Sequence, residues 1–288
     1  MDRGDRSVAG RAEKEKVKKG SAGMDKIVVY GGGQMGYGIM KGLIAAGVVR
    51  AEEILVSGSR PSRRAFLEED LGVRTSEDAS GELAGTDILL IAVNPHQVKD
   101  VTSAIAGKLP DETIVLSIAS GSPISMLEEE LGADRKIVRV MPNTMIEVGS
   151  GYSAVTPNSN ITEADKEKIT EFVSALGQTM YIEEDMFQTF AAYSGPGPMW
   201  AYKFIEAMID AGVLAGFSRE DAREMTLQNV KGAAETLLAT GDHPAVRVDR
   251  TTSPKGLTIE AIKVLEEKGF GGAIMDSVEA SVEKGNKV

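Results

Sequence analysis

Short apolar runs alternate with helix-like stretches over the first half of the chain, starting at Lys26. The runs are apolar at nearly every position, which is typical of strands that are buried on both faces of a parallel sheet. The first run, Ile-Val-Val-Tyr, leads directly into a glycine-rich turn, and the helix after it ends near Gly47. Strands that alternate with helices predict βαβ units. We expect strands at 27–30, 54–57, 87–93, 113–119 and 136–141, and added edge strands at 151–156 and 179–182.

After residue 182 the strand pattern stops, and the rest of the chain is predicted to be helical. The helix expected at 199–214 has an apolar face, and Trp200 and Phe204 make its other faces apolar too, so we expect it to be buried nearly all round. A helical unit of about a hundred residues buries a limited share of its surface, so we expect a partner subunit to cover it. Further helices are predicted from a Ser218 cap to Gly241, at 258–268 and at 272–282.

Residues 1–23 differ from the rest of the chain. They are mostly charged or small and lack the apolar core of a secretory signal. This composition predicts a disordered extension or a vector-derived tail, which makes Met24 the candidate natural start. The predicted fold is therefore α/β, with an N-terminal Rossmann-type parallel-sheet domain at 24–182 followed by an all-helical domain at 183–288.

Composition removes several classes of function. Lys and Arg total 32 against 43 Asp and Glu, and the net charge of −11 disfavours binding to nucleic acid or to an acidic membrane. No stretch approaches the roughly 18 apolar residues of a membrane span. Cysteine is absent and the histidines are His96 and His243, which excludes thiol chemistry, disulfides and a Cys- or His-rich metal site. We expect a cytoplasmic protein that uses no metal and in which both histidines are structural or peripheral.

The turn after the first predicted strand fits a dinucleotide-binding fingerprint, Gly31-x-Gly33-x-x-Gly36. The first glycine permits a tight turn, the second lets a pyrophosphate approach the backbone, and the third lets helix and strand pack closely. N–H groups at the helix start can bind phosphate. Because the pattern follows the first strand of a βαβ series, it predicts nucleotide binding. The predicted cofactor-binding residues are Gly31, Gly33, Gln34, Met35, Gly36, Ser57, Ser59, Arg60, Ala92, Val93, Asn94 and Pro95.

The end of the second predicted strand indicates which nucleotide binds. NAD-preferring folds carry an Asp or Glu there, which bonds to the ribose 2′-hydroxyl. Here the sequence reads Ser57-Gly58-Ser59-Arg60, without a carboxylate. Hydroxyls and a guanidinium suit a 2′-phosphate, although a solvated basic turn would have the same composition. We therefore expect NADPH as the cofactor, with NADH as the less favoured alternative.

Several motifs resemble those of the pyrroline-5-carboxylate reductase family, and the resemblance runs from about Met24 to the C-terminus. Residues 138–144 resemble the family's VRVMPNT, and residues 193–198 resemble its LSGSGP. Within 204–213, two short segments resemble FIEAL and DAGV. The segment 252–259, Thr-Ser-Pro-Lys-Gly-Leu-Thr-Ile, is similar to the family signature TSPGGTTI. These motifs are separated along the chain and occur in the same order as in the family, which argues against a chance similarity.

The resemblance implies reduction of 1-pyrroline-5-carboxylate to proline by hydride transfer from NADPH, the final step of proline biosynthesis. It also implies a homodimer with interlocked helical domains, and larger rings of dimers are common in the family. The site it implies is one where the nicotinamide meets the cyclic imine acid across the dimer interface. By resemblance, the Thr258 hydroxyl lies at the ring nitrogen and is the catalytic group; a plain helix N-cap is the competing interpretation. The predicted substrate-binding residues are Ser253, Gly256, Leu257 and Thr258.

Four residues depart from the family's pattern, namely Asn94, Pro196, Arg250 and Lys255. Lys255 stands where the signature has its first glycine, and a Cβ there restricts the turn. Asn94 stands where the family usually has a lysine near the cofactor. These departures leave three alternatives open: a reductase of a related imine, a β-hydroxyacid dehydrogenase with Lys203 as its catalytic lysine, and a non-catalytic NADP-binding regulatory paralogue.

Overall fold

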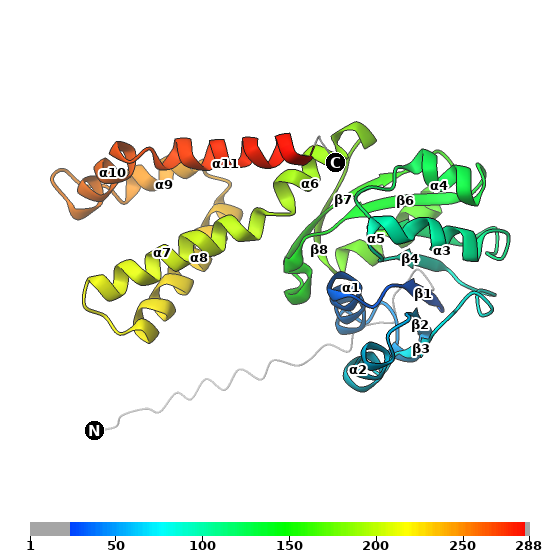
Figure 1. Cartoon of the computed structure of the whole chain (residues 1–288). Coiled ribbons are helices and arrows are strands. Elements are labelled where there is room, and N and C mark those ends of the chain that lie inside the picture. The colour runs from blue at the N-terminus through cyan, green and yellow to red at the C-terminus, as the bar shows by residue number, and fades with distance from the viewer. Residues whose placement is uncertain (1–23, 286–288) are drawn as a thin grey trace, which may run out of the picture.

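The computed structural model describes residues 24–285, which form a sheet-containing part followed by a helical arm (Figure 1). The arm extends away from the sheet and then returns, so that its last helix ends at the base of the arm. Residues 1–23, for which the sequence predicts an extension, lie outside the described residues.

The sheet has eight strands, β1 (Ile27–Tyr30), β2 (Ile54–Ser57), β3 (Arg74–Ser76), β4 (Ile88–Ile91), β5 (Ile114–Ser117), β6 (Lys136–Met141), β7 (Gly151–Pro157) and β8 (Gly177–Tyr181). Their order is β3-β2-β1-β4-β5-β6-β7-β8. All neighbouring strands are parallel except β6 and β7, which are antiparallel. Successive strands run outward in both directions from β1, so a crevice for a ligand is expected at the carboxyl end of β1.

Helices cover both faces of the sheet and create two apolar cores. One face carries α1 (Gln34–Ala45), α2 (Pro61–Leu71) and α5 (Glu163–Ser174), and the other carries α3 (Val98–Ile105) and α4 (Ile124–Leu131). Successive residues of a strand face opposite sides. Val29 of β1 therefore packs in the core with Leu43 of α1, whereas Val28 and Tyr30 pack in the core with Val101 of α3.

Two features of the sheet differ from the sequence-based expectation. β3 was not predicted, because its Arg-Thr-Ser sequence is short and polar and offers no apolar run. The segment expected as an edge strand at 151–156 is interior, since β7 pairs with both β6 and β8. Its burial on most positions follows from this place between two strands.

The arm contains α6 (Phe187–Ser194), α7 (Gly197–Leu214), α8 (Arg219–Thr240), α9 (Pro244–Arg250), α10 (Leu257–Glu267) and α11 (Phe270–Gly285). α7 and α8 lie side by side, and α11 returns to α6, where Ser281 Oγ donates to the carbonyl of Ala192 at 2.7 Å. As predicted, Ser218 caps α8, because its Oγ accepts from the N–H of Asp221 at 3.1 Å. Gly241 ends α8 in the left-handed conformation.

The expectation that the helix at 199–214 is buried nearly all round is wrong for the single chain. Tyr202 is 56% exposed and Phe204 is 43% exposed. The physical reason is that, within residues 24–285, α7 packs mainly against α8, which leaves much of its remaining surface exposed. α10 and α11 also expose large apolar side chains, including Val264 and Met275. Apolar exposure of this extent marks an interaction surface.

A buried ion pair joins the sheet to the base of the arm. Arg139 on β6 is 3% exposed and donates to Glu184 Oε1 at 2.7 Å and to the carbonyl of Ser120 at 2.8 Å. Its guanidinium lies 3.8 Å from the ring centre of Phe187, the first residue of α6. Burial lowers the pKa of Arg139, and the nearby Glu184 opposes this shift. The pair holds the start of α6 against the sheet, because removing the half-exposed Glu184 would leave the buried charge of Arg139 uncompensated.

Candidate nucleotide and substrate sites

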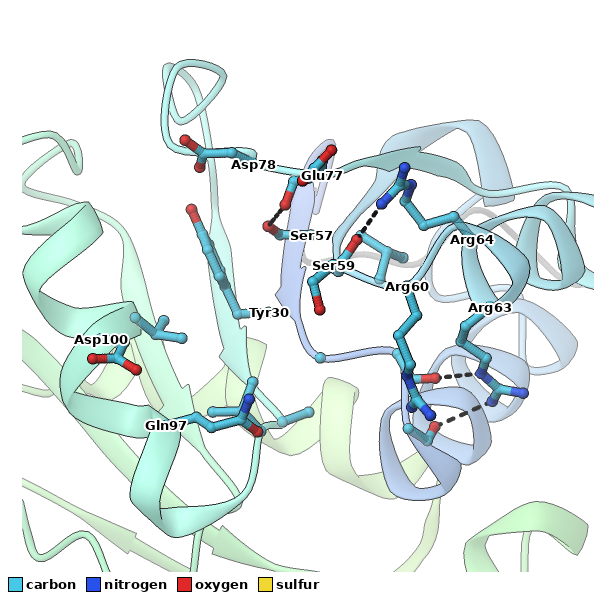
Figure 2. Close-up of a pocket in the computed structure, with 18 of the residues that line it drawn as sticks. Tyr30, Ser57, Ser59, Arg60, Arg63, Arg64, Glu77, Asp78, Gln97 and Asp100 are labelled. Carbon is cyan, nitrogen blue, oxygen red and sulfur yellow. Dashed lines mark hydrogen bonds between the residues drawn. The ribbon is translucent and has the colours of Figure 1, made fainter.

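A cavity of about 460 Å³ lies at the carboxyl ends of β1, β2 and β4, where the sheet topology predicts a ligand site (Figure 2). The glycine loop 31–33 forms one wall, and the turn 58–60 with the start of α2 forms another. Gln97 and Asp100 approach from the side of α3. Backbone, hydroxyl and guanidinium groups thus converge on one space, as a site for an anionic ligand requires.

The glycine loop has the geometry that the fingerprint predicts. Gly31 has a φ of +106°, and a Cβ there would overlap the carbonyl of Ala92. A Cβ on Gly36 would overlap the carbonyl of Gly31, whereas the corresponding position on Gly33 faces open space. Gly33 is also the N-cap of α1 and provides no side chain to the first N–H groups of the helix. The loop and the uncapped helix start therefore fit the pyrophosphate of a dinucleotide.

Three arginines line the cavity, and they differ in what they bind. Arg63 Nε donates to the carbonyl of Gly32 at 2.6 Å, and Arg64 Nη1 donates to the carbonyl of Gly58 at 2.7 Å. The side chain of Arg60 makes no hydrogen bond or ion pair with any other residue in the described range 24–285. Arg60 is therefore the guanidinium that is available to a 2′-phosphate.

Two carboxylates also line the cavity, and the sequence did not indicate them. Glu77 and Asp78 follow β3, which pairs with β2 and so brings them beside Ser57. Ser57 Oγ donates to the backbone carbonyl of Glu77 at 3.4 Å. The carboxylate of Asp78 accepts hydrogen bonds from both the backbone N–H and the hydroxyl of Ser80, and these bonds lower the pKa of Asp78. Its charge is thus held within its own turn, at the end of the cavity away from the glycine loop.

Tyr30, the last residue of β1, brings a buried hydroxyl to the cavity. The side chain is 6% exposed, and its hydroxyl has no hydrogen-bond partner among the described residues. Figure 2 shows the ring rising between the strand end and Asp78. Burial, with a smaller contribution from the negative charge of Asp78, raises the pKa of Tyr30 to about 12. The hydroxyl therefore stays protonated at neutral pH.

Most of the predicted nucleotide-binding residues come together around this cavity. Those that line it are Gly31, Gly33, Ser57, Ser59, Arg60, Ala92, Val93 and Asn94. Gln34, Met35 and Gly36 form the first turn of α1 beside the cavity, and Pro95 begins a short helix, η2 (Pro95–Gln97). The structure adds Tyr30, Gly32, Arg63, Arg64, Glu77, Asp78 and Gln97. Arg63 and Arg64 could have been predicted from the sequence, because both follow Arg60 in a short basic segment. The two carboxylates could not, because they reach the cavity only through the pairing of β3 with β2.

The predicted substrate residues Ser253, Gly256, Leu257 and Thr258 lie at the turn between α9 and α10. Gly256 is the N-cap of α10 and Thr258 is the second residue inside the helix, so the interpretation of Thr258 as an N-cap is wrong. The helix begins one residue earlier than expected because Gly256 adopts the extended cap conformation, with φ −78° and ψ 170°. Lys255 has a φ of +57°, alone among the described non-glycine residues in having a positive φ. This is the conformation that the glycine of the family signature would adopt freely.

The turn and the cavity lie far apart in one chain. Figure 1 shows the α9–α10 junction at the distal end of the arm, remote from the carboxyl ends of β1 and β2. Near the turn, Asp242 pairs with Arg247 at 2.8 Å and with Arg250 at 3.0 Å. His243 Nδ1 accepts from the N–H of Ala245 at 3.2 Å as the N-cap of α9, which is a structural role.

Two further motifs meet at the base of the arm. Asn143, at the end of the 138–144 segment, donates from Nδ2 to Ser194 Oγ at 3.4 Å. Its Oδ1 accepts from the N–H of Met145 at 3.2 Å, which caps η3 (Thr144–Val148). These bonds tie the loop after β6 to the end of α6.

Within residues 24–285, no three or more His, Cys, Asp or Glu side chains are grouped so that they could hold a metal ion. None of the helices in the same range has the length and apolar character needed to cross a membrane.

Two family models match the chain, one on each side of the junction between sheet and arm. The model described as "NADP oxidoreductase coenzyme F420-dependent" matches residues 26–121. The model described as "Pyrroline-5-carboxylate reductase dimerisation" matches residues 184–288.

Individual relatives match over nearly the whole length. Pyrroline-5-carboxylate reductase of Escherichia coli is 39% identical over 263 residues, with 91% of this chain and 98% of the relative covered. The Methanosarcina acetivorans enzyme is 38% identical over 266 residues, with the same coverage. Plasmodium falciparum pyrroline carboxylate reductase, solved with NADP bound, superposes with a TM-score of 0.82 at 31% identity, covering 91% of this chain and 98% of that one. With its glycine-loop cavity, its helical arm and this likeness across both, the chain belongs to the pyrroline-5-carboxylate reductase family.

Proposed function

We propose that this protein reduces 1-pyrroline-5-carboxylate to proline with NADPH as the hydride donor. The observation that carries the proposal is the likeness to pyrroline-5-carboxylate reductases over both the cavity-bearing part and the arm. We further propose that the functional units are a nucleotide-binding domain at 24–182 and a dimerisation and substrate domain at 183–288.

Bound NADPH supplies the hydride that the imine carbon receives. The residues of the chain supply orientation, because a cyclic imine protonates readily and needs no strong acid from the enzyme. The backbone N–H groups at the start of α10 bind the substrate carboxylate, since Gly256 leaves them without a side-chain cap. The Thr258 hydroxyl forms a hydrogen bond at the ring nitrogen, which has already taken a proton from water when the adjacent carbon receives the hydride.

NADPH is proposed over NADH because of the groups around the end of β2. Arg60 has an unengaged guanidinium and Ser59 adds a hydroxyl to the same turn, whereas the Ser57 hydroxyl beside them already donates to the carbonyl of Glu77. A 2′-phosphate would accept charge-assisted hydrogen bonds from Arg60 and Ser59. The relative from Plasmodium falciparum was solved with NADP bound, which is in line with this choice.

A homodimer in the cytoplasm is proposed as the working form, with the arm of one subunit completing the site of the other. The exposed apolar faces of α7, α10 and α11 support a second copy as the partner, and so does the match to a dimerisation model. Light scattering of the full chain at catalytic concentration is expected to give at least twice the monomer mass. A stable, active monomer would contradict this proposal.

The alternative of a β-hydroxyacid dehydrogenase has little support from the geometry. Its candidate base, Lys203, is exposed on α7 and pairs with Glu206, and this hydrogen bond raises the pKa of Lys203. A lysine that acts as a base would need its pKa lowered.

Expression of the chain in a proline auxotroph tests the proposed function directly. Growth without proline, together with NADPH oxidation that depends on pyrroline-5-carboxylate and not on 3-hydroxyacids, is the expected result. A chain that binds NADPH but rescues no growth and reduces no imine would instead be the non-catalytic paralogue. Preferential turnover of another cyclic imine would identify a related imine reductase.

A further inference from the structure

Arg63 on α2 reaches across to the glycine loop and binds its backbone. Its Nε donates to the carbonyl of Gly32 at 2.6 Å, and its Nη2 lies 3.4 Å from the carbonyl of Gly33 (Figure 2). The two nitrogens of one guanidinium thus engage two consecutive carbonyls. These carbonyls belong to the segment that the fingerprint assigns to the pyrophosphate.

The orientation of these carbonyls fixes the orientation of two N–H groups. In a planar trans peptide, the C=O of one residue and the N–H of the next point in opposite directions. When Arg63 holds the carbonyls of Gly32 and Gly33, the N–H groups of Gly33 and Gln34 are directed the other way. Gly33 has no Cβ and no atom within 4 Å of the position that one would occupy, so no side chain packs at that position. The N–H of Tyr37 in α1 also donates to the carbonyl of Gly33 at 2.9 Å, so Arg63 adds to the hold on that peptide and is the donor to the carbonyl of Gly32.

The Arg63 side chain is itself held firmly. Its guanidinium carbon lies 4.7 Å from the ring centre of Phe66 and 5.3 Å from that of Tyr37. The two rings are 5.7 Å apart, and the Tyr37 hydroxyl donates to Asp70 at 2.8 Å. An aromatic pair from α1 and α2 therefore fixes a guanidinium whose donors point at the loop. By contrast, the side chain of Arg60 has no such contacts within residues 24–285.

We propose that Arg63 is a positioning residue for the dinucleotide pyrophosphate: it orients the peptide groups of the glycine loop and binds no phosphate itself. The inference rests on the proposed function in one respect, namely that the cavity binds NADPH. It assigns different tasks to two arginines, one at the N-cap of α2 and one in the first turn of that helix. Arg60 discriminates the 2′-phosphate, whereas Arg63 serves the part that NADPH and NADH have in common.

The test compares the dissociation constants of NADPH and NADH, measured by fluorescence titration of the full chain. Arg63→Met removes the donors and keeps an apolar stem between the rings. It is expected to raise both constants by the same factor, roughly fivefold to tenfold, with kcat at saturating NADPH little changed. Arg63→Lys keeps the charge but lacks the forked donors, so it is expected to behave like Arg63→Met. Phe66→Leu, which loosens the guanidinium without touching the loop, should raise both constants less.

Arg50→Gln is the matched control, because Arg50 is an exposed arginine of the same part of the chain that pairs with Glu53 away from the cavity. It should leave both constants unchanged. If Arg63→Met weakened NADPH alone, Arg63 would be a 2′-phosphate ligand and the proposal would be wrong. If Arg63→Met lowered the melting temperature but left both dissociation constants unchanged, Arg63 would be a structural residue only. If Arg63→Lys bound both nucleotides as tightly as the parent, the positive charge alone would matter and the forked donors would not. Failure of the parent chain to bind either nucleotide would overturn the proposed function along with this inference.

Discussion

Ser253 Oγ occupies the space that a side chain on Gly256 would need, so the two residues close the turn before α10 against each other. The N–H of Gly256 also donates to the carbonyl of Ser253 at 3.0 Å. The turn is therefore tight, and the N–H groups at the start of α10 have a defined direction. Any role for this turn in binding a carboxylate depends on that closure.

Thr258→Ala is expected to lower the turnover of pyrroline-5-carboxylate roughly twofold to twelvefold, because one neutral hydrogen bond contributes about 0.5–1.5 kcal/mol. Thr258→Ser keeps the hydroxyl and should retain most of the activity. NADPH binding should barely change in either variant. Since Gly256 and not Thr258 caps α10, Thr258→Ala should also cost less stability than the roughly 1 kcal/mol typical of a lost N-cap. Steady-state kinetics with parental kcat and KM would remove Thr258 from the catalytic site.

Lys255→Gly is expected to raise the free energy of unfolding by up to about 1 kcal/mol. A non-glycine residue in the left-handed region costs about 1–2 kcal/mol, and the greater freedom of glycine in the unfolded chain offsets part of this gain. Lys255→Ala is the control, because it removes the charge and keeps the Cβ. Urea titration should show stabilisation by glycine alone; equal stabilisation by alanine would point to charge instead of backbone conformation.

Arg60→Ala is expected to raise the KM for NADPH while leaving the KM for NADH nearly unchanged. Loss of a charge-assisted contact to the 2′-phosphate is worth about 1.5–3 kcal/mol, or roughly a 10- to 150-fold change. Arg60→Lys should lie between the parent and the alanine variant. Initial rates measured with each nucleotide give both KM values. A parent enzyme that used NADH as efficiently as NADPH would contradict the assignment of Arg60 to the 2′-phosphate.

Tyr30→Phe is expected to increase stability near neutral pH and to change its dependence on alkaline pH. A buried hydroxyl without a partner costs about 1–3 kcal/mol, which the phenylalanine avoids. The pKa of Tyr30 is raised from its ordinary value near 10 to about 12, so the unfolded chain loses this proton first. The parent should therefore lose stability relative to the variant between pH 10 and 12, by at most about 1.4 kcal/mol per pH unit.

Urea titrations of both proteins across that pH range provide the measurement. The exposed Tyr152, replaced in the same way, serves as the control. Parallel pH profiles for the parent and Tyr30→Phe would show that the Tyr30 hydroxyl is not buried in solution.

Local patterns predicted much of this molecule, and the exceptions share one physical cause. Ile27 to Tyr30 followed by Gly31-x-Gly33-x-x-Gly36 was sufficient to predict β1, the glycine loop and α1, because all of that information is contiguous. The sequence indicated a turn restricted by the Cβ of Lys255, and the structure adds that this residue has a positive φ. Glu77 was not foreseen as part of the cavity, because only the pairing of β3 with β2 brings it there. The exposure of Tyr202 was not foreseen either, because an apolar helix pattern does not itself indicate what covers each face of the helix.

The distance between the glycine loop and the α9–α10 turn has a genetic consequence (Figure 1). If the arm of one subunit serves the cavity of the other, a chain damaged only in its loop still provides an intact arm, and a chain whose α9–α10 turn is destroyed still provides an intact loop. A mixed dimer of the two would contain one complete site. Two such alleles, each inactive alone, should therefore complement each other when a cell expresses both.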